Sequence, residues 1–147
     1  LILSSSGLTI QLRCDSTILQ QAALHSYFAV TDLNDTKVLG IGDDYYDKVK
    51  NNQRVTADPQ LSFNQEIDRV YNKPAAALQL KTGSKTLAIA QHGYDSTIVW
   101  NPAAERCAAI SDAPANGYQQ FVCVETARLN LALNAPLALE QQITLQQ

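Results

Sequence analysis

The chain has 147 residues, a net charge of −3 and a sequence pI near 5.2. This length fits a single domain, residues 1–147, that can bury roughly 70% of the surface its unfolded chain exposes. The 11 lysines and arginines are spread without clusters, and no window approaches the ~18 to 20 apolar residues of a membrane span. We therefore predict a soluble protein that binds neither nucleic acid nor a membrane.

Short segments with alternating apolar residues follow one another along the chain, which is the pattern of half-buried β-strands. The first is residues 8–14 (LTIQLRC). Residues 77–90 contain two apolar runs around Thr82-Gly83-Ser84, which predicts a hairpin. Residues 96–102 (STIVWNP) and 120–126 (QFVCVET) are further β-rich runs. Short strands joined by turn residues predict an all-β, antiparallel sandwich.

Two long segments lack this pattern, residues 40–60 and residues 101–118. We expect them to form irregular connections, and long ordered loops in compact β domains tend to be functional.

The three cysteines, Cys14, Cys107 and Cys123, are an odd number without CxxC spacing, and each has apolar neighbours. This pattern is typical of reduced cysteines in a core and favours a cytoplasmic location.

Three ionisable residues lie in apolar surroundings: His25 in AALHSYF, Asp68 in EIDRVY and Glu125 in FVCVETA. A buried charge is costly unless it is paired or has a function. Each residue alone has an ordinary explanation, such as a histidine bonded to a carbonyl, an aspartate capping a turn or a glutamate paired with an arginine. The alternative is that the three form a catalytic site. Because His25 and His92 are far apart and no zinc-ligand spacing is present, we predict no metal.

Five motifs occur in an order that resembles the D-hexose-6-phosphate mutarotases, also called glucose-6-phosphate 1-epimerases. These enzymes belong to the galactose mutarotase-like, or aldose 1-epimerase, superfamily. The motifs are ALHSYF (23–28), DRVY (68–71), IVWNP (98–102), SDAP with GYQQ (between 111 and 120) and FVCVETA (121–127). The resemblance implies an antiparallel β-supersandwich. Whole members of the family are longer, and the resemblance covers their C-terminal half, so we expect this chain to form the C-terminal portion of such a supersandwich.

The resemblance also implies roles for the three ionisable residues. His25 matches the family's catalytic histidine, Glu125 its catalytic glutamate, and Asp68 an aspartate that contacts sugar hydroxyls. The implied reaction interconverts the α and β anomers of a hexose 6-phosphate by opening and closing the sugar ring. One base and one acid suffice, and each such proton transfer is typically worth ~10² to 10⁴ in rate. No cofactor is expected.

Two alternatives remain at this point: an aldose 1-epimerase acting on free sugars, and a non-catalytic carbohydrate-binding domain of the same fold. We expect His25, Asp68 and Glu125 to line one cleft, with the imidazole and the Glu125 carboxylate separated by about the width of a sugar ring. The family's phosphate ligands are expected in the N-terminal half. The basic residues near the matched motifs in this chain are Lys48, Arg54, Arg69 and Lys73.

Overall fold

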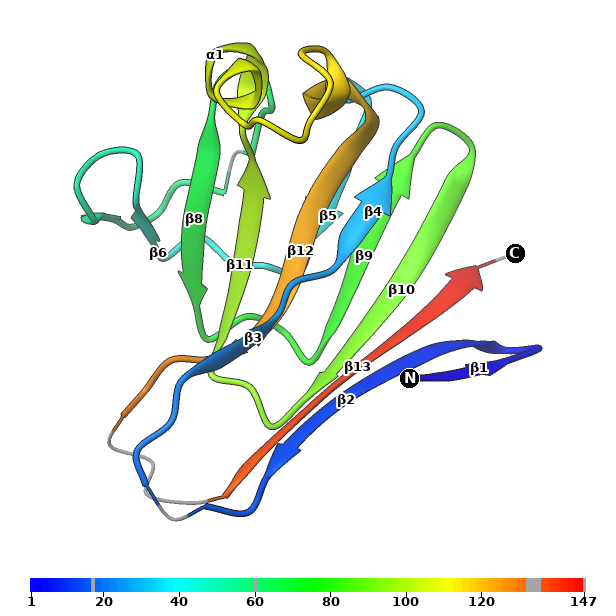
Figure 1. Cartoon of the computed structure of the whole chain (residues 1–147), viewed down its shortest axis with the longest axis vertical. Coiled ribbons are helices and arrows are strands. Elements are labelled where there is room, and N and C mark those ends of the chain that lie inside the picture. Colours follow the sequence, from blue (N-terminus) through cyan, green and yellow to red (C-terminus); the bar gives the residue numbers. More distant parts are fainter. Residues whose placement is uncertain (17, 60, 132–135, 147) are drawn as a thin grey trace.

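The computed structural model describes residues 1–16, 18–59, 61–131 and 136–146. Within these residues the chain forms two antiparallel sheets (Figure 1), which confirms the predicted all-β class. The six-stranded sheet has the order β1 (Ile2–Ser4), β2 (Gly7–Cys14), β13 (Leu137–Gln146), β10 (Lys85–His92), β9 (Ala77–Thr82) and β5 (Lys37–Leu39). The seven-stranded sheet has the order β3 (Ala22–Leu24), β12 (Phe121–Arg128), β11 (Ser96–Asn101), β8 (Ile67–Asn72), β6 (Tyr45–Asp47) and β7 (Gln53–Val55), and β4 (Tyr27–Ala29) also pairs with β12.

The predicted strands are present at the expected places. The segment 8–14 lies in β2, and the hairpin of β9 and β10 turns at Gly83 and Ser84. Gly83 has a φ of 54°, a left-handed conformation that a two-residue turn requires and that glycine adopts without strain. The segments 96–102 and 120–126 contain β11 and most of β12.

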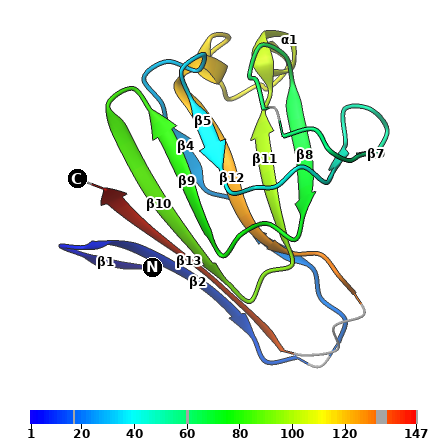
Figure 2. The same ribbon diagram turned by 180° about the vertical axis from the view of Figure 1, so that it is seen from behind.

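The main core lies between the two sheets. In Figure 1, β5 and β9 lie behind β12 and β4, and Figure 2 shows them in front from the other side. In both views β1 and β2 extend beyond the seven-stranded sheet. The alternation of β12 sends every second side chain into this core, and the intervening side chains face outward. Val122 and Val124 of β12 and Val99 of β11 are completely buried, and they share one apolar cluster with Leu80 and Ile89 of the opposite sheet.

A buried polar network joins the two sheets beside this core. The side-chain oxygen of Gln91 accepts hydrogen bonds from the hydroxyls of Thr97 (2.9 Å) and Thr126 (3.0 Å). The amide of Gln141 donates to Thr126 and to a main-chain carbonyl of β12, both at 3.0 Å, and its oxygen accepts a bond of 2.6 Å from the hydroxyl of Ser26. Because buried polar groups are costly when unpaired, the network fixes the position of one sheet on the other.

The two segments expected to be irregular contain regular structure, so that expectation was wrong for parts of each. Residues 40–60 include the hairpin of β6 and β7. Within β6 the side chains of Tyr45 and Asp47 face the interior and that of Tyr46 faces outward, which is the alternation of a half-buried strand. Residues 101–118 contain the short helix α1 (Ala103–Ala108) and the start of the 3-10 helix η1 (Gly117–Gln120).

All three cysteines are free, and Cys107 and Cys123 are buried as expected. Cys14 is exposed, contrary to the expectation, because it ends β2 where that strand runs past the opposite sheet. In the described part of the chain, no helix has the length and apolar character needed to cross a membrane.

Candidate active site

The pairing of β3 and β4 with β12 brings His25 to Glu125. Leu24 pairs with Thr126 and Tyr27 with Cys123, so one register covers both short strands and sets His25 opposite Glu125. The Nε2 atom of His25 lies 3.4 Å from Oε1 of Glu125. The imidazole side chain is 50% exposed, whereas the glutamate side chain is 5% exposed. A solvent-accessible imidazole therefore covers a buried carboxyl group.

Aromatic rings pack against the imidazole of this pair. Tyr27 stacks on His25, with ring centroids 4.9 Å apart and planes inclined by 22°. Trp100 meets His25 edge-on at 5.9 Å, and Phe121 packs on Tyr27 at 5.0 Å and on Trp100 at 5.8 Å. Aromatic side chains prefer such stacked and edge-to-face arrangements. These three rings were not predicted as site residues, although Tyr27 stands in ALHSYF, Trp100 in IVWNP and Phe121 in FVCVETA.

Asp68 lies on the same face of the sheet. It pairs with Trp100, which pairs with Cys123, and Glu125 is the second residue after Cys123. Paired residues of antiparallel strands and residues two apart along a strand point to one side of a sheet. The structure thus brings His25, Asp68 and Glu125 together on the outer face of the seven-stranded sheet, on β8, on β12 and between β3 and β4.

The ionisable groups of this face influence one another. Burial raises the pKa of Glu125 to about 7, and the negative charge of Asp68 adds to the rise. Burial also raises the pKa of Asp68, while the nearby charges of Lys48 and His25 act in the opposite direction. A carboxyl group with a pKa near neutrality exchanges a proton readily at physiological pH, which suits it to acid–base chemistry.

One detail of the predicted geometry was wrong. We expected the width of a sugar ring between the imidazole and the Glu125 carboxylate, but the two groups are in contact at 3.4 Å. The reason is that directly opposed residues on neighbouring strands have Cβ atoms only about 5 Å apart.

The basic residues near the motifs do not all face this site. Arg69 is buried, with its guanidinium 4.4 Å from the ring centre of Tyr45 and an Nη1 atom that donates to the Tyr71 hydroxyl at 3.5 Å. It belongs to the core side of β8. Arg54 donates two hydrogen bonds, of 3.0 and 2.9 Å, to the carboxylate of Asp44.

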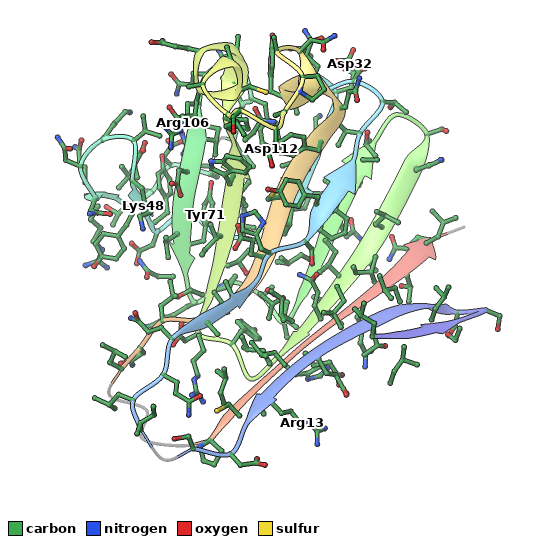
Figure 3. The ribbon with its side chains drawn as sticks, viewed as in Figure 1. Arg13, Asp32, Lys48, Tyr71, Arg106 and Asp112 are labelled. Atoms are coloured by element: carbon green, nitrogen blue, oxygen red, sulfur yellow. The ribbon has the colours of Figure 1, made fainter. Side chains whose placement is uncertain are left out.

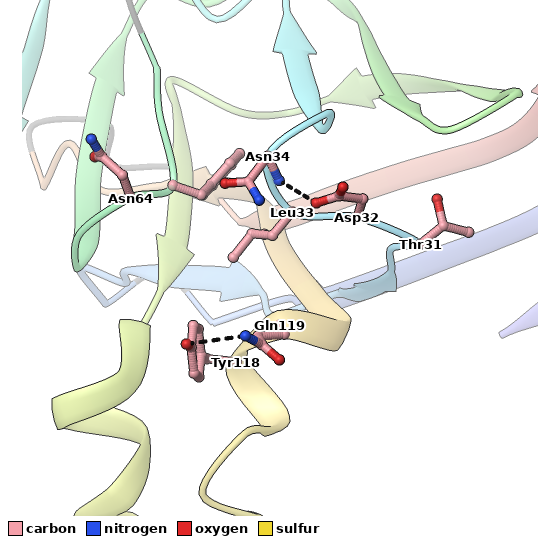
Figure 4. Close-up of a pocket in the computed structure, with 8 residues that line it drawn as sticks. Thr31, Asp32, Leu33, Asn34, Asn64, Tyr118 and Gln119 are labelled. Carbon is pink, nitrogen blue, oxygen red and sulfur yellow. Dashed lines mark hydrogen bonds between the residues drawn. The ribbon is translucent and has the colours of Figure 1, made fainter.

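A separate cavity of about 420 Å³ lies at the end of the sandwich beside η1. Several of its polar groups bond to one another: Asp32 accepts from the main chain of Asn34 at 2.8 Å, and the Gln119 amide donates to the Tyr118 hydroxyl at 3.2 Å (Figure 4). It contains none of the predicted site residues. Its lining consists of Thr31, Asp32, Leu33, Asn34, Phe63, Asn64, Tyr118 and Gln119.

Known proteins are similar to this chain in both sequence and structure. A protein of Salmonella typhimurium named "Putative glucose-6-phosphate 1-epimerase" is 36% identical over 120 residues, which cover 80% of this chain and 41% of that protein. The protein of the same name in Escherichia coli is 34% identical over 109 residues, 72% of this chain and 37% of that protein. The crystal structure of a protein of Salmonella typhimurium named "putative mutarotase" superposes with a TM-score of 0.85 at 32% identity, over 93% of this chain and 49% of that one.

These comparisons confirm the resemblance predicted from the motifs and the fold that it implied. The chain spans half or less of the length of each of these proteins. The family model described as Aldose 1-epimerase matches residues 2–142. This chain, with its two antiparallel sheets, belongs to the aldose 1-epimerase family.

Proposed function

We propose that the protein interconverts the α and β anomers of a hexose 6-phosphate. The observation that carries the proposal is the contact between the exposed imidazole of His25 and the buried carboxyl of Glu125, whose pKa is about 7. The family is that of aldose 1-epimerases, and the relatives' name, glucose-6-phosphate 1-epimerase, supports the choice of a phosphorylated hexose.

In the proposed mechanism Glu125 is the base and His25 the acid. The carboxylate takes the proton of the C1 hydroxyl while the imidazolium gives a proton to the ring oxygen, so the bond between C1 and the ring oxygen breaks and an open-chain aldehyde forms. Rotation about the C1–C2 bond presents the other face of the aldehyde. The reverse transfers then close the ring and restore both groups.

The short distance between acid and base is compatible with this chemistry. The C1 hydroxyl and the ring oxygen are bonded to the same carbon, so the two oxygens that must exchange protons are themselves close together. Two groups in contact in the free protein can each turn to one of these oxygens. Asp68, on the same face, is proposed to accept hydrogen bonds from the sugar hydroxyls, and the exposed ring of Tyr27 offers an apolar surface to the sugar.

Two alternatives use the same face. An epimerase of free aldoses would need the same acid and base without a phosphate site. A non-catalytic carbohydrate-binding domain would need hydroxyl contacts and aromatic surfaces, but not a buried carboxyl with a pKa near neutrality beside a histidine. The latter feature favours catalysis.

The predicted single domain and cytoplasmic location are part of this proposal, and the free cysteines support the location.

The test is anomer exchange measured by NMR on glucose 6-phosphate. Glu125→Gln and His25→Asn each remove one proton transfer and should slow exchange by about 10² to 10⁴. The control is His92→Asn, which alters the other histidine, an exposed residue of β10, and should leave the rate unchanged. Wild-type rates in both site variants, with circular dichroism showing intact folds, would refute the assignment.

A further inference from the structure

The imidazole of His25 has a single polar partner within the described ranges of the chain. Its Nε2 atom contacts Oε1 of Glu125 at 3.4 Å, and half of its side chain is exposed. In the proposed reaction the two groups part, because each must reach a different oxygen of the sugar. The imidazole then loses this partner at the step in which the direction of its Nε2 atom decides whether the proton is transferred.

Tyr27 lies against the face of this imidazole. The main-chain N–H of Ser26 donates to the carbonyl of Leu24 at 3.0 Å, which makes a three-residue turn centred on His25. Strand β4 begins directly after this turn, at Tyr27, and the two rings stack with centroids 4.9 Å apart and planes inclined by 22°. Stacked rings can turn within their planes, but a tilt out of the plane breaks the contact. A tyrosine face also attracts cations, so the stack suits the protonated imidazolium that acts as the acid.

Tyr27 is itself held by two neighbouring rings. Phe121 of β12 packs on it at 5.0 Å with planes inclined by 56°, and Trp100 of β11 meets it edge-on at 6.3 Å. Trp100 also meets the imidazole edge-on, at 5.9 Å. Both rings come from strands of the sheet that carries Glu125, so the stack keeps the imidazole in a fixed relation to the base.

The contact uses the ring of Tyr27 and not its hydroxyl. Partial burial raises the pKa of this hydroxyl, and Cys123, Glu125 and Asp112 add to the rise. Asp112 lies near helix α1 (Figure 3). The hydroxyl therefore stays protonated and uncharged in the neutral pH range. Among the described residues it has no hydrogen-bond partner, so phenylalanine in place of tyrosine should preserve the stack.

We propose that Tyr27 is a positioning residue, whose ring keeps the imidazole of His25 in the plane needed for proton transfer when Nε2 leaves Glu125 for the ring oxygen of the sugar. The inference rests on the proposed function, because it gives Tyr27 a task within that reaction. This task is separate from the apolar surface that Tyr27 offers to the sugar. A leucine can supply the surface, but only an aromatic ring can supply the stack.

Steady-state anomer exchange of glucose 6-phosphate by the full-length protein separates the two tasks. Tyr27→Leu should lower kcat by about tenfold to a hundredfold and leave KM unchanged, whereas Tyr27→Phe should keep both constants. Because 60% of Tyr27 is exposed, neither change should affect the fold. The matched control is Tyr46→Leu, which removes another exposed, outward-facing tyrosine, on β6, and it should change neither constant.

The NMR signals of His25 provide a second readout that does not depend on turnover. An aromatic ring shifts the signals of protons that lie over its face, so Tyr27→Leu should move the signals of the carbon-bound imidazole protons. Tyr27→Phe should leave them in place. The chain has two histidines, and the spectrum of His25→Asn identifies which signals belong to His25.

Three outcomes would overturn the inference: a raised KM at unchanged kcat in Tyr27→Leu, an equal loss of kcat in Tyr27→Leu and Tyr27→Phe, or unmoved His25 signals in Tyr27→Leu. The NMR comparison separates this inference from the proposed function. If the unaltered protein exchanges the anomers of neither glucose 6-phosphate nor glucose, the proposed function fails, whereas the His25 signals still decide whether Tyr27 holds the imidazole.

Discussion

The protonation state of Glu125 depends on the burial of its carboxyl group and on the negative charge of Asp68. It stands at an outward position of β12, yet only 4% of it is exposed, because the imidazole of His25 and the rings around it cover the carboxyl. Burial disfavours the charged form and raises the pKa to about 7, and Asp68 adds to this effect. The charge of one residue is thus governed by residues on three other segments of the chain.

The influence of Asp68 on Glu125 predicts a change in the pH profile of Asp68→Asn. A base must be deprotonated to act, so the rate should rise with pH through the pKa of Glu125, near 7. Removing the negative charge of Asp68 lowers that pKa, so the rising limb of kcat/KM should move to lower pH. The control is Asp43→Asn, an exposed carboxylate before β6. An unmoved limb with a raised KM would mean that Asp68 only contacts the sugar.

At the scale of elements, the His25 segment is held by a strand of the opposite sheet. His25 and Ser26 interrupt the ladder between β3 and β4, and the hydroxyl of Ser26 reaches across to Gln141 of β13. The same glutamine is bonded to Thr126 of β12. The pairing of His25 with Glu125 therefore depends on the packing of the two sheets as well as on one register.

Gln141→Leu tests this dependence. The change keeps the size of the side chain but removes its bonds to Ser26 and to β12, so the free energy of unfolding should fall by about 1 to 3 kcal/mol. The anomer-exchange rate should fall as well, because the His25 segment loses its anchor. The control is Gln142→Leu at the next position, where the side chain is exposed and donates a hydrogen bond to the half-buried Glu140. Equal effects of the two variants on stability and rate would contradict a positioning role.

At the scale of the whole molecule, the sheet that carries β1, β2 and β13 is covered on only part of its inner face. Leu3 pairs with Leu8, and Leu8 pairs with Ile143, which itself pairs with Ile89 of the core. These residues therefore share the inner face. Towards β1 and the end of β13 the apolar side chains become accessible, with Leu3 82% and Leu145 60% exposed.

This apolar surface predicts self-association of the 147-residue chain at high concentration, since exposed apolar patches tend to be buried in contacts. The double variant Leu3→Gln with Leu145→Gln should lower the association measured by sedimentation velocity, without loss of thermal stability. Leu39→Gln provides the control, because Leu39 is 41% exposed but follows the buried Val38 on β5 and so faces outward. Monomeric behaviour of the parent chain at high concentration would contradict the prediction.

The sequence predicted β2, the β9–β10 hairpin, β11 and β12, and it also pointed to the three ionisable residues that we propose for the site. Side chains alternate between the two faces of a strand, so the apolar pattern of QFVCVET alone places Val122 and Val124 on one face and Glu125 on the other. The family resemblance, in turn, rests on short motifs that can be read directly.

Only the tertiary structure decided how these pieces meet. Glu125 and His25 are 100 positions apart in the chain, and their contact depends on a strand register that no local pattern encodes. Lys48 and Arg69 look equivalent as basic residues near the motifs, yet one lies on the site face and the other beneath Tyr45 in the core. The physical reason is that side-chain direction follows from local alternation, whereas proximity follows from which strands pair and how the sheets pack.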